Sequence, residues 1–188
     1  MVLYCQPPLV FGSKETFFCL PEVRTEGLRL VLGIDPGTHR TGFALVDGRL
    51  ARLRAVTYGV ITTRPNEPAG SRLLQIYERV RALIETYEPE RAGIERLFLG
   101  ANAPSAVSVG QARGVVLLAL AQAGTPIGEY TPSEVKTAIV GYGRADKAQV
   151  QAMVQVLFGL ERVPRPDDAA DALAVAVCAL NHEPSLVR

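Results

Sequence analysis

Several residue types are scarce in this chain of 188 residues, and each scarcity argues against a class of protein. Cysteine occurs only at Cys5, Cys19 and Cys178, an odd number without metal-ligand spacing, so neither a disulfide framework nor a zinc site is expected. No stretch reaches about 18 uninterrupted apolar residues, and the first residues lack the basic start and apolar run of a signal peptide. We therefore expect a cytoplasmic protein without a membrane span.

An excess of either charge is also missing. The chain has 20 Lys and Arg residues against 19 Asp and Glu residues, so its net charge of +1 does not indicate a simple polybasic binder of nucleic acid or membranes. Lysine is rare within the basic set: only Lys14, Lys136 and Lys147 stand beside 17 arginines. The planar guanidinium donates two bonds to a phosphate at once, although a compositional bias of the source genome explains the preference equally well.

Residues 1–26 differ from the rest of the chain. They contain aromatic residues and a proline pair, and they show no helical or strand period. We interpret them as a loosely ordered N-terminal extension. Residues 27–188 are then a single domain, because a chain of this length leaves little room for a second.

Hydrophobic patterning from residue 29 onward predicts a mixed α/β fold. Apolar runs predict five strands, at 29–35, 41–48, 51–63, 91–95 and 126–130. Apolar steps of three and four, with capping and stop signals, predict helices at 70–87, 105–123, from 132 to the break near 141–143, onward to 158, and from 167. This order predicts one mixed five-stranded sheet, three antiparallel strands followed by parallel ones, with helices on both faces.

The helix predicted at 105–123 is apolar nearly all round in its second half, "GVVLLALAQA". A helix of this kind is either deeply buried or lies at a subunit interface. The pattern alone leaves both possibilities open.

Four acidic residues stand where carboxylates are costly to bury. Asp35 and Glu95 each end an apolar strand, and Asp168 and Asp171 lie three residues apart at the start of an apolar helix. Simpler explanations exist for each: a turn starter at Asp35, a surface residue at Glu95, and capping of the helix by the aspartates. Together, however, the acids would meet where two strands and a docked helix converge.

Several carboxylates in one cleft repel one another unless a cation neutralises them. Hard oxygen ligands indicate Mg²⁺ or Mn²⁺. Two such ions about 3.5–4 Å apart activate water and stabilise the leaving oxygen in phosphodiester hydrolysis. The four acids therefore favour a metal-dependent nuclease.

Four blocks in order, "GIDPGTHRTG", "IERLFLGANAPSAVSVGQARG", "EYTPSEVKTAIVGYGRADKAQV" and "DAADALAVA", resemble those of RuvC-type Holliday junction resolvases. The resemblance implies a ribonuclease H-like fold, a homodimer, and Mg²⁺-dependent paired incision of four-way DNA junctions in recombination and repair. It also implies the RuvA–RuvB branch-migration complex as a partner. Carried over by position, the catalytic and metal-binding residues are Asp35, Glu95, Asp168 and Asp171, with two Mg²⁺ ions, replaceable by Mn²⁺.

The resemblance also assigns DNA-facing residues. It implies that Phe98 stacks on an unpaired base and that Lys136 and Lys147 lie near the scissile backbone; the simpler explanations are a core phenylalanine and, for Lys147, a solvated helix face. Arg113 contacts phosphate or braces its loop. His39 either faces the DNA or is an exposed turn residue.

Three alternatives remain open at this point. A kinase or actin-like ATPase also begins with a strand followed by Asp, Gly and Thr, but needs two lobes and gives no reason for the Asp168/Asp171 pair. A second alternative is a ribonuclease H-like nuclease that acts on RNA or on other branched DNA. The nucleases of this kind implicated in ribosomal RNA maturation are shorter and do not carry the "QARG" and "GYGRADK" blocks. A DNA-structure binder without activity has no reason to place acids against phosphate.

Overall fold

The computed structural model describes residues 18–19, 29–48, 53–96 and 103–182. Six strands occur in this part of the chain: β1 (Phe18–Cys19), β2 (Leu30–Asp35), β3 (Arg40–Asp47), β4 (Arg54–Thr62), β5 (Arg91–Glu95) and β6 (Ile127–Tyr130). Five helices accompany them: α1 (Ala69–Tyr87), α2 (Ala103–Gln122), α3 (Pro132–Val140), α4 (Lys147–Phe158) and α5 (Asp167–Asn181).

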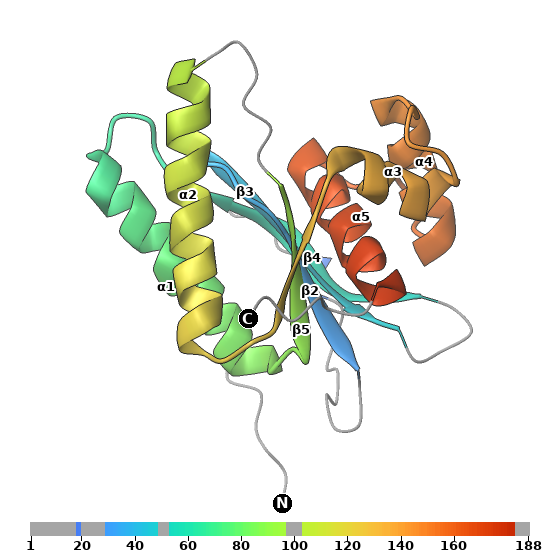
Figure 1. Cartoon of the computed structure of the whole chain (residues 1–188), viewed down its shortest axis with the longest axis horizontal. Coiled ribbons are helices and arrows are strands. Elements are labelled where there is room, and N and C mark those ends of the chain that lie inside the picture. Colours follow the sequence, from blue (N-terminus) through green and yellow to red (C-terminus); the bar gives the residue numbers. More distant parts are fainter. Residues whose placement is uncertain (1–17, 20–28, 49–52, 97–102, 183–188) are drawn as a thin grey trace, which may run out of the picture.

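The strands form one sheet in the order β1-β4-β3-β2-β5-β6 (Figure 1). β2, β3 and β4 pair antiparallel in succession, and β2 pairs parallel with β5, which pairs parallel with β6. The five predicted strands and their mixed pairing are confirmed, and so are the five predicted helices. α1 and α2 cover one face of the sheet, and α3, α4 and α5 lie on the other (Figure 1).

The sheet has one strand more than predicted. β1 pairs antiparallel with β4, with Phe18 opposite Tyr58 and Cys19 opposite Thr57. Two residues are too few to show an alternating pattern, so the sequence carries no sign of this strand. The rest of the predicted N-terminal extension lies outside the described residues.

Local signals in the sequence mark the starts of α3 and α4; the capping box at α3 was predicted and the one at α4 was not. Thr131 and Glu134 form a capping box at the start of α3, and Asp146 and Gln149 form a second one at α4. Gly141 ends α3 in the left-handed conformation, which glycine adopts without steric cost. None of the helices in the described part of the chain is both long and apolar enough to cross a membrane.

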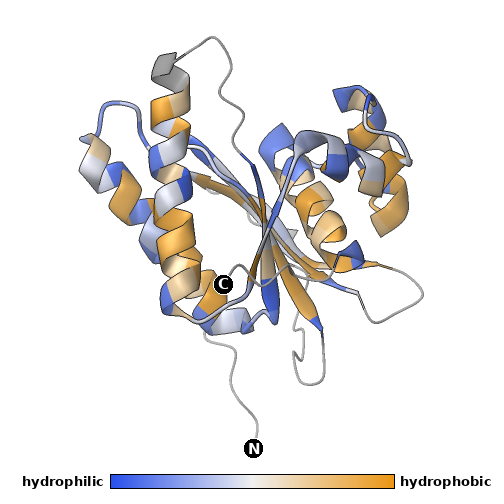
Figure 2. Cartoon of the chain, in the orientation of Figure 1, coloured by the Kyte–Doolittle hydropathy of each residue, from blue (hydrophilic) through white to orange (hydrophobic). Residues whose placement is uncertain are grey.

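Large side chains fill the core between the sheet and the pair α1 and α2. Because side chains alternate along a strand, every second residue of the central strands points to this side. The set comprises Leu30, Leu32 and Ile34 of β2, Phe43 and Leu45 of β3, and Ile94 of β5, which pack against Ile76, Val80, Val116 and Leu120. Hydrophobic residues occupy the central strands and parts of both helical layers (Figure 2).

Small residues fill the other face, where α5 crosses the strands. A Cβ atom at Gly33 would overlap the Ala172 carbonyl oxygen, and one at Gly42 would overlap the Asp168 carbonyl oxygen. A Cβ atom at Gly93 would lie 2.8 Å from the Cβ of Ala179, also too close. The backbone of α5 therefore rests directly on glycines of β2 and β3, while its side chains pack on Gly93 of β5, and this close approach determines where the acids at its start lie.

Candidate active site

Asp35 and Glu95 lie side by side at the carboxyl ends of two neighbouring parallel strands. Ile34 of β2 is in register with Ile94 of β5, so the next residues, Asp35 and Glu95, leave the sheet together. Alternation places Asp35 on the same face as Gly33 and Glu95 on the same face as Gly93. Both carboxyls therefore project toward the side that α5 covers.

Asp168 and Asp171 reach this point from the first turns of α5. The contact of Gly42 with the Asp168 backbone holds the start of the helix against β3, next to the end of β2. The N-cap of α5 is Pro166, and no side chain caps the helix. Capping bonds therefore do not account for the aspartates, although their charges do complement the helix dipole.

Electrostatic repulsion couples Asp35 to the other three carboxyls. Burial raises the pKa of Asp35 to about 8, and the negative charges of Asp171, Glu95 and Asp168 add to this rise. Burial, and then the charge of Asp171, also raises the pKa of Glu95. Burial also raises the pKa of Asp171, although the charge and hydrogen bond of Lys147 act against the rise; the charges of Asp168 and Asp167 add to it. Asp35, Glu95 and Asp171 therefore each ionise less readily than a free carboxyl.

Carboxylate oxygens in mutual repulsion are the donor set that a hard divalent cation prefers. The chemistry of the cluster thus fits Mg²⁺ or Mn²⁺. Among the described residues, however, no three Asp, Glu, His or Cys side chains are arranged as ligands of a single ion. The acids come from neighbouring elements, but the side chains of the described residues are not arranged as a complete coordination site.

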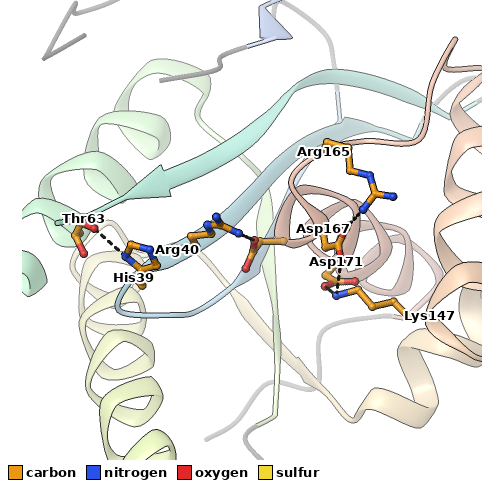
Figure 3. Close-up of polar contacts among 8 residues, drawn as sticks. His39, Arg40, Thr63, Lys147, Arg165, Asp167 and Asp171 are labelled. Carbon is orange, nitrogen blue, oxygen red and sulfur yellow. Dashed lines mark hydrogen bonds and ion pairs between the residues drawn. The ribbon is translucent and has the colours of Figure 1, made fainter. Parts of the chain in front are cut away.

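Two basic side chains from other elements contact the acids of α5 instead, besides the neighbouring Arg165, which pairs with Asp167 (Figure 3). Lys147 Nζ lies 3.3 Å from Asp171 Oδ2 and 3.3 Å from Asp167 Oδ2. Arg40 Nη1 lies 3.9 Å from Asp168 Oδ2. Sequence reasoning missed Arg40, because nothing in the pattern shows that the first residue of β3 faces the start of α5.

Two adjoining cavities open beside the acids. The first is lined by Asp35, Pro36, Glu95, Arg96, Val109, Arg113 and Pro132. The second is lined by Glu95, Pro132, Val135, Lys136, Lys147, Val150, Asp171, Ala174 and Val175. Because Glu95 and Pro132 line both, the two cavities adjoin, and each is lined by carboxyl and basic side chains; we call the two together the groove.

Hydrogen bonds fix the loop that follows Asp35. Thr41 Oγ1 donates to the Gly37 carbonyl at 2.7 Å, and Arg72 Nη2 of α1 donates to the Thr38 carbonyl at 2.8 Å. Arg72 Nε also donates to Thr63 Oγ1 at 2.9 Å. His39 is an exposed turn residue whose Nδ1 lies 3.0 Å from the Thr63 carbonyl oxygen (Figure 3).

The remaining predicted site residues differ in their surroundings. Lys136 lines the groove, and its charge lowers the pKa of Glu95, against the effect of burial. Arg113 lines the other end and forms an ion pair with Glu129, which ties α2 to β6; this pair matches a bracing role. Phe98 lies outside the described residues.

Comparisons with known proteins agree on one family. A family model described as crossover junction endodeoxyribonuclease RuvC matches residues 31–179. The crossover junction endodeoxyribonuclease RuvC of Moorella thermoacetica is 54% identical over 155 residues, which cover 82% of this chain and 93% of the relative. That of Chloroflexus aggregans is 54% identical over 157 residues, which cover 84% of this chain and 96% of the relative.

Solved structures give the same answer. RuvC of Thermus thermophilus is 39% identical with a TM-score of 0.73, and the match covers 79% of this chain and 92% of that one. A second structure, described as T. thermophilus RuvC in complex with Holliday junction substrate, is 38% identical with a TM-score of 0.76. Its match covers 80% of this chain and 92% of the other.

Proposed function

This chain belongs to the RuvC family of crossover junction endodeoxyribonucleases, and from this we infer that it resolves four-way (Holliday) DNA junctions by phosphodiester hydrolysis in recombination and repair. Its fold is ribonuclease H-like, as in the RuvC structures that it resembles. The observation that carries the inference furthest is the convergence of Asp35, Glu95 and Asp171 from three separate elements beside one groove.

Asp35, Glu95, Asp168 and Asp171 are proposed to hold two Mg²⁺ ions, which Mn²⁺ can replace. Two bound ions would supply an activated water and stabilisation of the leaving oxygen. The chain itself supplies the rest: burial raises the pKa of Asp35, and the register of β2 and β5 places Asp35 next to Glu95.

The groove is proposed to take the scissile strand of the junction. Lys136 and Lys147 line one end and Arg113 the other, so positive charges stand where phosphates would pass the carboxyls. By family resemblance, Phe98 is proposed to stack on a base exposed at the crossover, which is worth about 1–3 kcal/mol per base.

A homodimer is proposed because a four-way junction presents two strands of like polarity, which two sites on a two-fold axis can cut. The outer surface of α2 offers the contact. Val107 and Leu118 are 63% and 52% exposed, and together with exposed Gln111 and Gly114 they follow one helical stripe. Family resemblance adds the RuvA–RuvB complex as a partner and the cytoplasm as the place of action.

Incubation of the protein with a synthetic four-way junction and Mg²⁺ tests the function. We expect two symmetrical nicks in strands of like polarity, none on a linear duplex of the same sequence, and none in the presence of EDTA. RNA–DNA hybrid and flap substrates identify a nuclease of other specificity. Tight junction binding without cleavage under any divalent cation would instead indicate a DNA-structure binder and contradict the proposal.

A further inference from the structure

The acids at the start of α5 are each in contact with a basic side chain that comes from elsewhere in the fold. Lys147, the first residue of α4, lies 3.3 Å from both Asp167 and Asp171. Arg40, the first residue of β3, lies 3.9 Å from Asp168. Figure 3 shows both side chains extended toward α5. Neither contact is local in the sequence, so the fold itself brings these charges together.

The two sides of these pairs differ in freedom. The side chains of Lys147 and Arg40 are 56% and 51% exposed, whereas those of Asp171 and Asp168 are 30% and 27% exposed. Lys and Arg are long and flexible, so their charged ends can move into solvent or onto a neighbouring anion. The aspartates are short and fixed by the seat of α5 on the sheet. Only the basic partners can leave.

A divalent cation at Asp168 or Asp171 competes with these partners. An ammonium or guanidinium close to a carboxylate and a metal ion on the same carboxylate repel each other. A DNA phosphate offers Lys and Arg an anion of equal or better geometry. The phosphates of a bound strand can therefore release the carboxylates for metal.

We propose that Arg40 and Lys147 are positioning residues that act as exchangeable counter-cations: they occupy Asp168 and Asp171 in the DNA-free protein and pass to the phosphates when a junction binds. This inference rests on the proposed function. By linkage, DNA and metal then strengthen each other's binding. Ions enter the site when the substrate is present.

Asp167 has a distinct part in this exchange. It contacts Lys147 on one side and forms an ion pair with Arg165 on the other, and it is not one of the proposed metal ligands (Figure 3). When Asp171 binds metal, Asp167 keeps Lys147 within reach of the groove. Asp167 thus holds the lysine close to its next partner, the phosphate.

Mn²⁺ binding to the DNA-free protein, followed by electron paramagnetic resonance, provides the test. We expect Lys147→Gln and Arg40→Gln each to bind Mn²⁺ about three- to fivefold more tightly than wild type, the size of a partly exposed ion pair. Arg96→Gln is the matched control, because Arg96 lines the same groove and the described residues show no ion pair between it and any of the four proposed ligands. It removes the same charge and should leave Mn²⁺ affinity nearly unchanged. Melting temperatures confirm that all three variants fold.

Coupling is measured in Arg40→Gln, which keeps the four proposed ligands. In wild type, we expect half-maximal single-turnover cleavage of a saturating junction at a lower Mn²⁺ concentration than the DNA-free dissociation constant. In Arg40→Gln the ratio of the DNA-free dissociation constant to the Mn²⁺ concentration at half-maximal cleavage should fall about three- to fivefold, since the competing side chain is gone.

Two failures can be told apart. Equal Mn²⁺ affinity in Lys147→Gln, Arg40→Gln and Arg96→Gln, or undetectable binding by the first two, overturns the exchange even if wild type cuts junctions. Wild type that cuts no junction, with Mn²⁺ binding unchanged in Asp35→Asn, overturns the proposed function instead.

Discussion

The two faces of the central sheet are packed in opposite ways. Toward α1 and α2, the strands present Leu, Ile and Phe side chains, many of them fully buried. Toward α5, the same strands present Val31, Gly33, Ala44 and Gly93, and α5 packs against them with alanines along most of its length. We call this side of the sheet the small-residue face. One strand such as β2 serves both faces by alternation.

The contrast separates stability from geometry. Each large side chain on the α1 and α2 face contributes about 1.5–3 kcal/mol through burial. Glycine and alanine bury little area per residue, but they let the backbone of α5 touch the strands. Asp168 therefore lies beside the end of β2, where Asp35 emerges. We infer that the first face holds the domain together and the second sets the distances in the site.

The largest effect is expected at the end of the small-residue face. Asp35→Asn should lower junction cleavage about a thousandfold or more, because loss of a metal ligand removes several kcal/mol of transition-state stabilisation. Junction binding should persist, since shape and phosphate contacts supply it. Glu95→Gln and Asp168→Asn should behave alike. Cleavage assays with band-shift measurements test this, with Glu85→Gln on the outer surface of α1 as control. An active Asp35→Asn protein would contradict the assignment.

The outer surface of α2 extends the comparison beyond the core. Leu118→Glu should weaken the proposed dimer about a hundredfold or more, because it places a charge in an apolar contact against its own symmetry mate. Sedimentation at micromolar concentration should show a monomer with an unchanged melting temperature. Glu78→Gln on α1 is a control for charge change. Wild type that sediments as a monomer at this concentration would refute the dimer.

Substitutions can also test the roles of the two faces separately. Ile76→Ala removes a fully buried side chain from the α1 and α2 face and should cost about 2–5 kcal/mol of unfolding free energy. Cleavage by the folded fraction should hardly change. Urea unfolding and cleavage of the same samples give both numbers.

Gly33→Ala should show the reverse. The added methyl group meets the backbone of α5 at Ala172 and Ala176, so the helix must shift. We expect a smaller loss of stability, about 1–3 kcal/mol, and at least a tenfold loss of cleavage per folded molecule. If Gly33→Ala lost stability alone and Ile76→Ala lost activity alone, the assignment of roles to the faces would be wrong.

The same contrast explains what the sequence could predict. Strands and helices were predictable because apolar periodicity, the Thr131 capping box and the stop at Gly159 are local signals. The acids at Asp35 and Glu95 were recognisable because each ends an apolar strand. The seat of α5 on Gly33 and Gly42 was not predictable, since a glycine inside a strand does not say what approaches it.

Contacts between distant residues were equally hidden. The Arg40–Asp168 pair joins segments far apart in the sequence, and so does the Arg113–Glu129 pair, which ties α2 to β6. Charged side chains have no periodicity that names their partner. Only the fold shows that the basic residues stand against the acids.

Burial at the small-residue face predicts a pH dependence. The folded protein keeps a proton on Asp35 up to its pKa of about 8, whereas the unfolded chain releases it near 3.8. The folded state therefore binds more protons between these values, and unfolding free energy falls as pH rises, by up to about 1.4 kcal/mol per pH unit. Urea unfolding in EDTA at pH 5 and pH 8 should show this fall in wild type and a smaller one in Asp35→Asn. Equal slopes in both proteins would contradict it.

The smallest effect is expected at the edge of the small-residue face, where Lys136 is proposed to contact DNA rather than the protein core. Lys136 lines the groove beside Glu95 and Asp171, and the ion pairs of the described residues include none between Lys136 and either acid. If its ammonium neutralises one phosphate, Lys136→Ala should reduce the slope of log affinity against log salt by about 0.9. Fold and melting temperature should stay unchanged, because the side chain is only half-buried. Arg81→Ala, which breaks an exposed pair with Glu85 on α1, should leave the slope as it is. An unchanged slope in Lys136→Ala would mean that the Lys136 charge acts on Glu95 alone. Its loss would then raise the pKa of Glu95, and the only effect of the substitution would be a shift of the pH dependence of cleavage to higher pH.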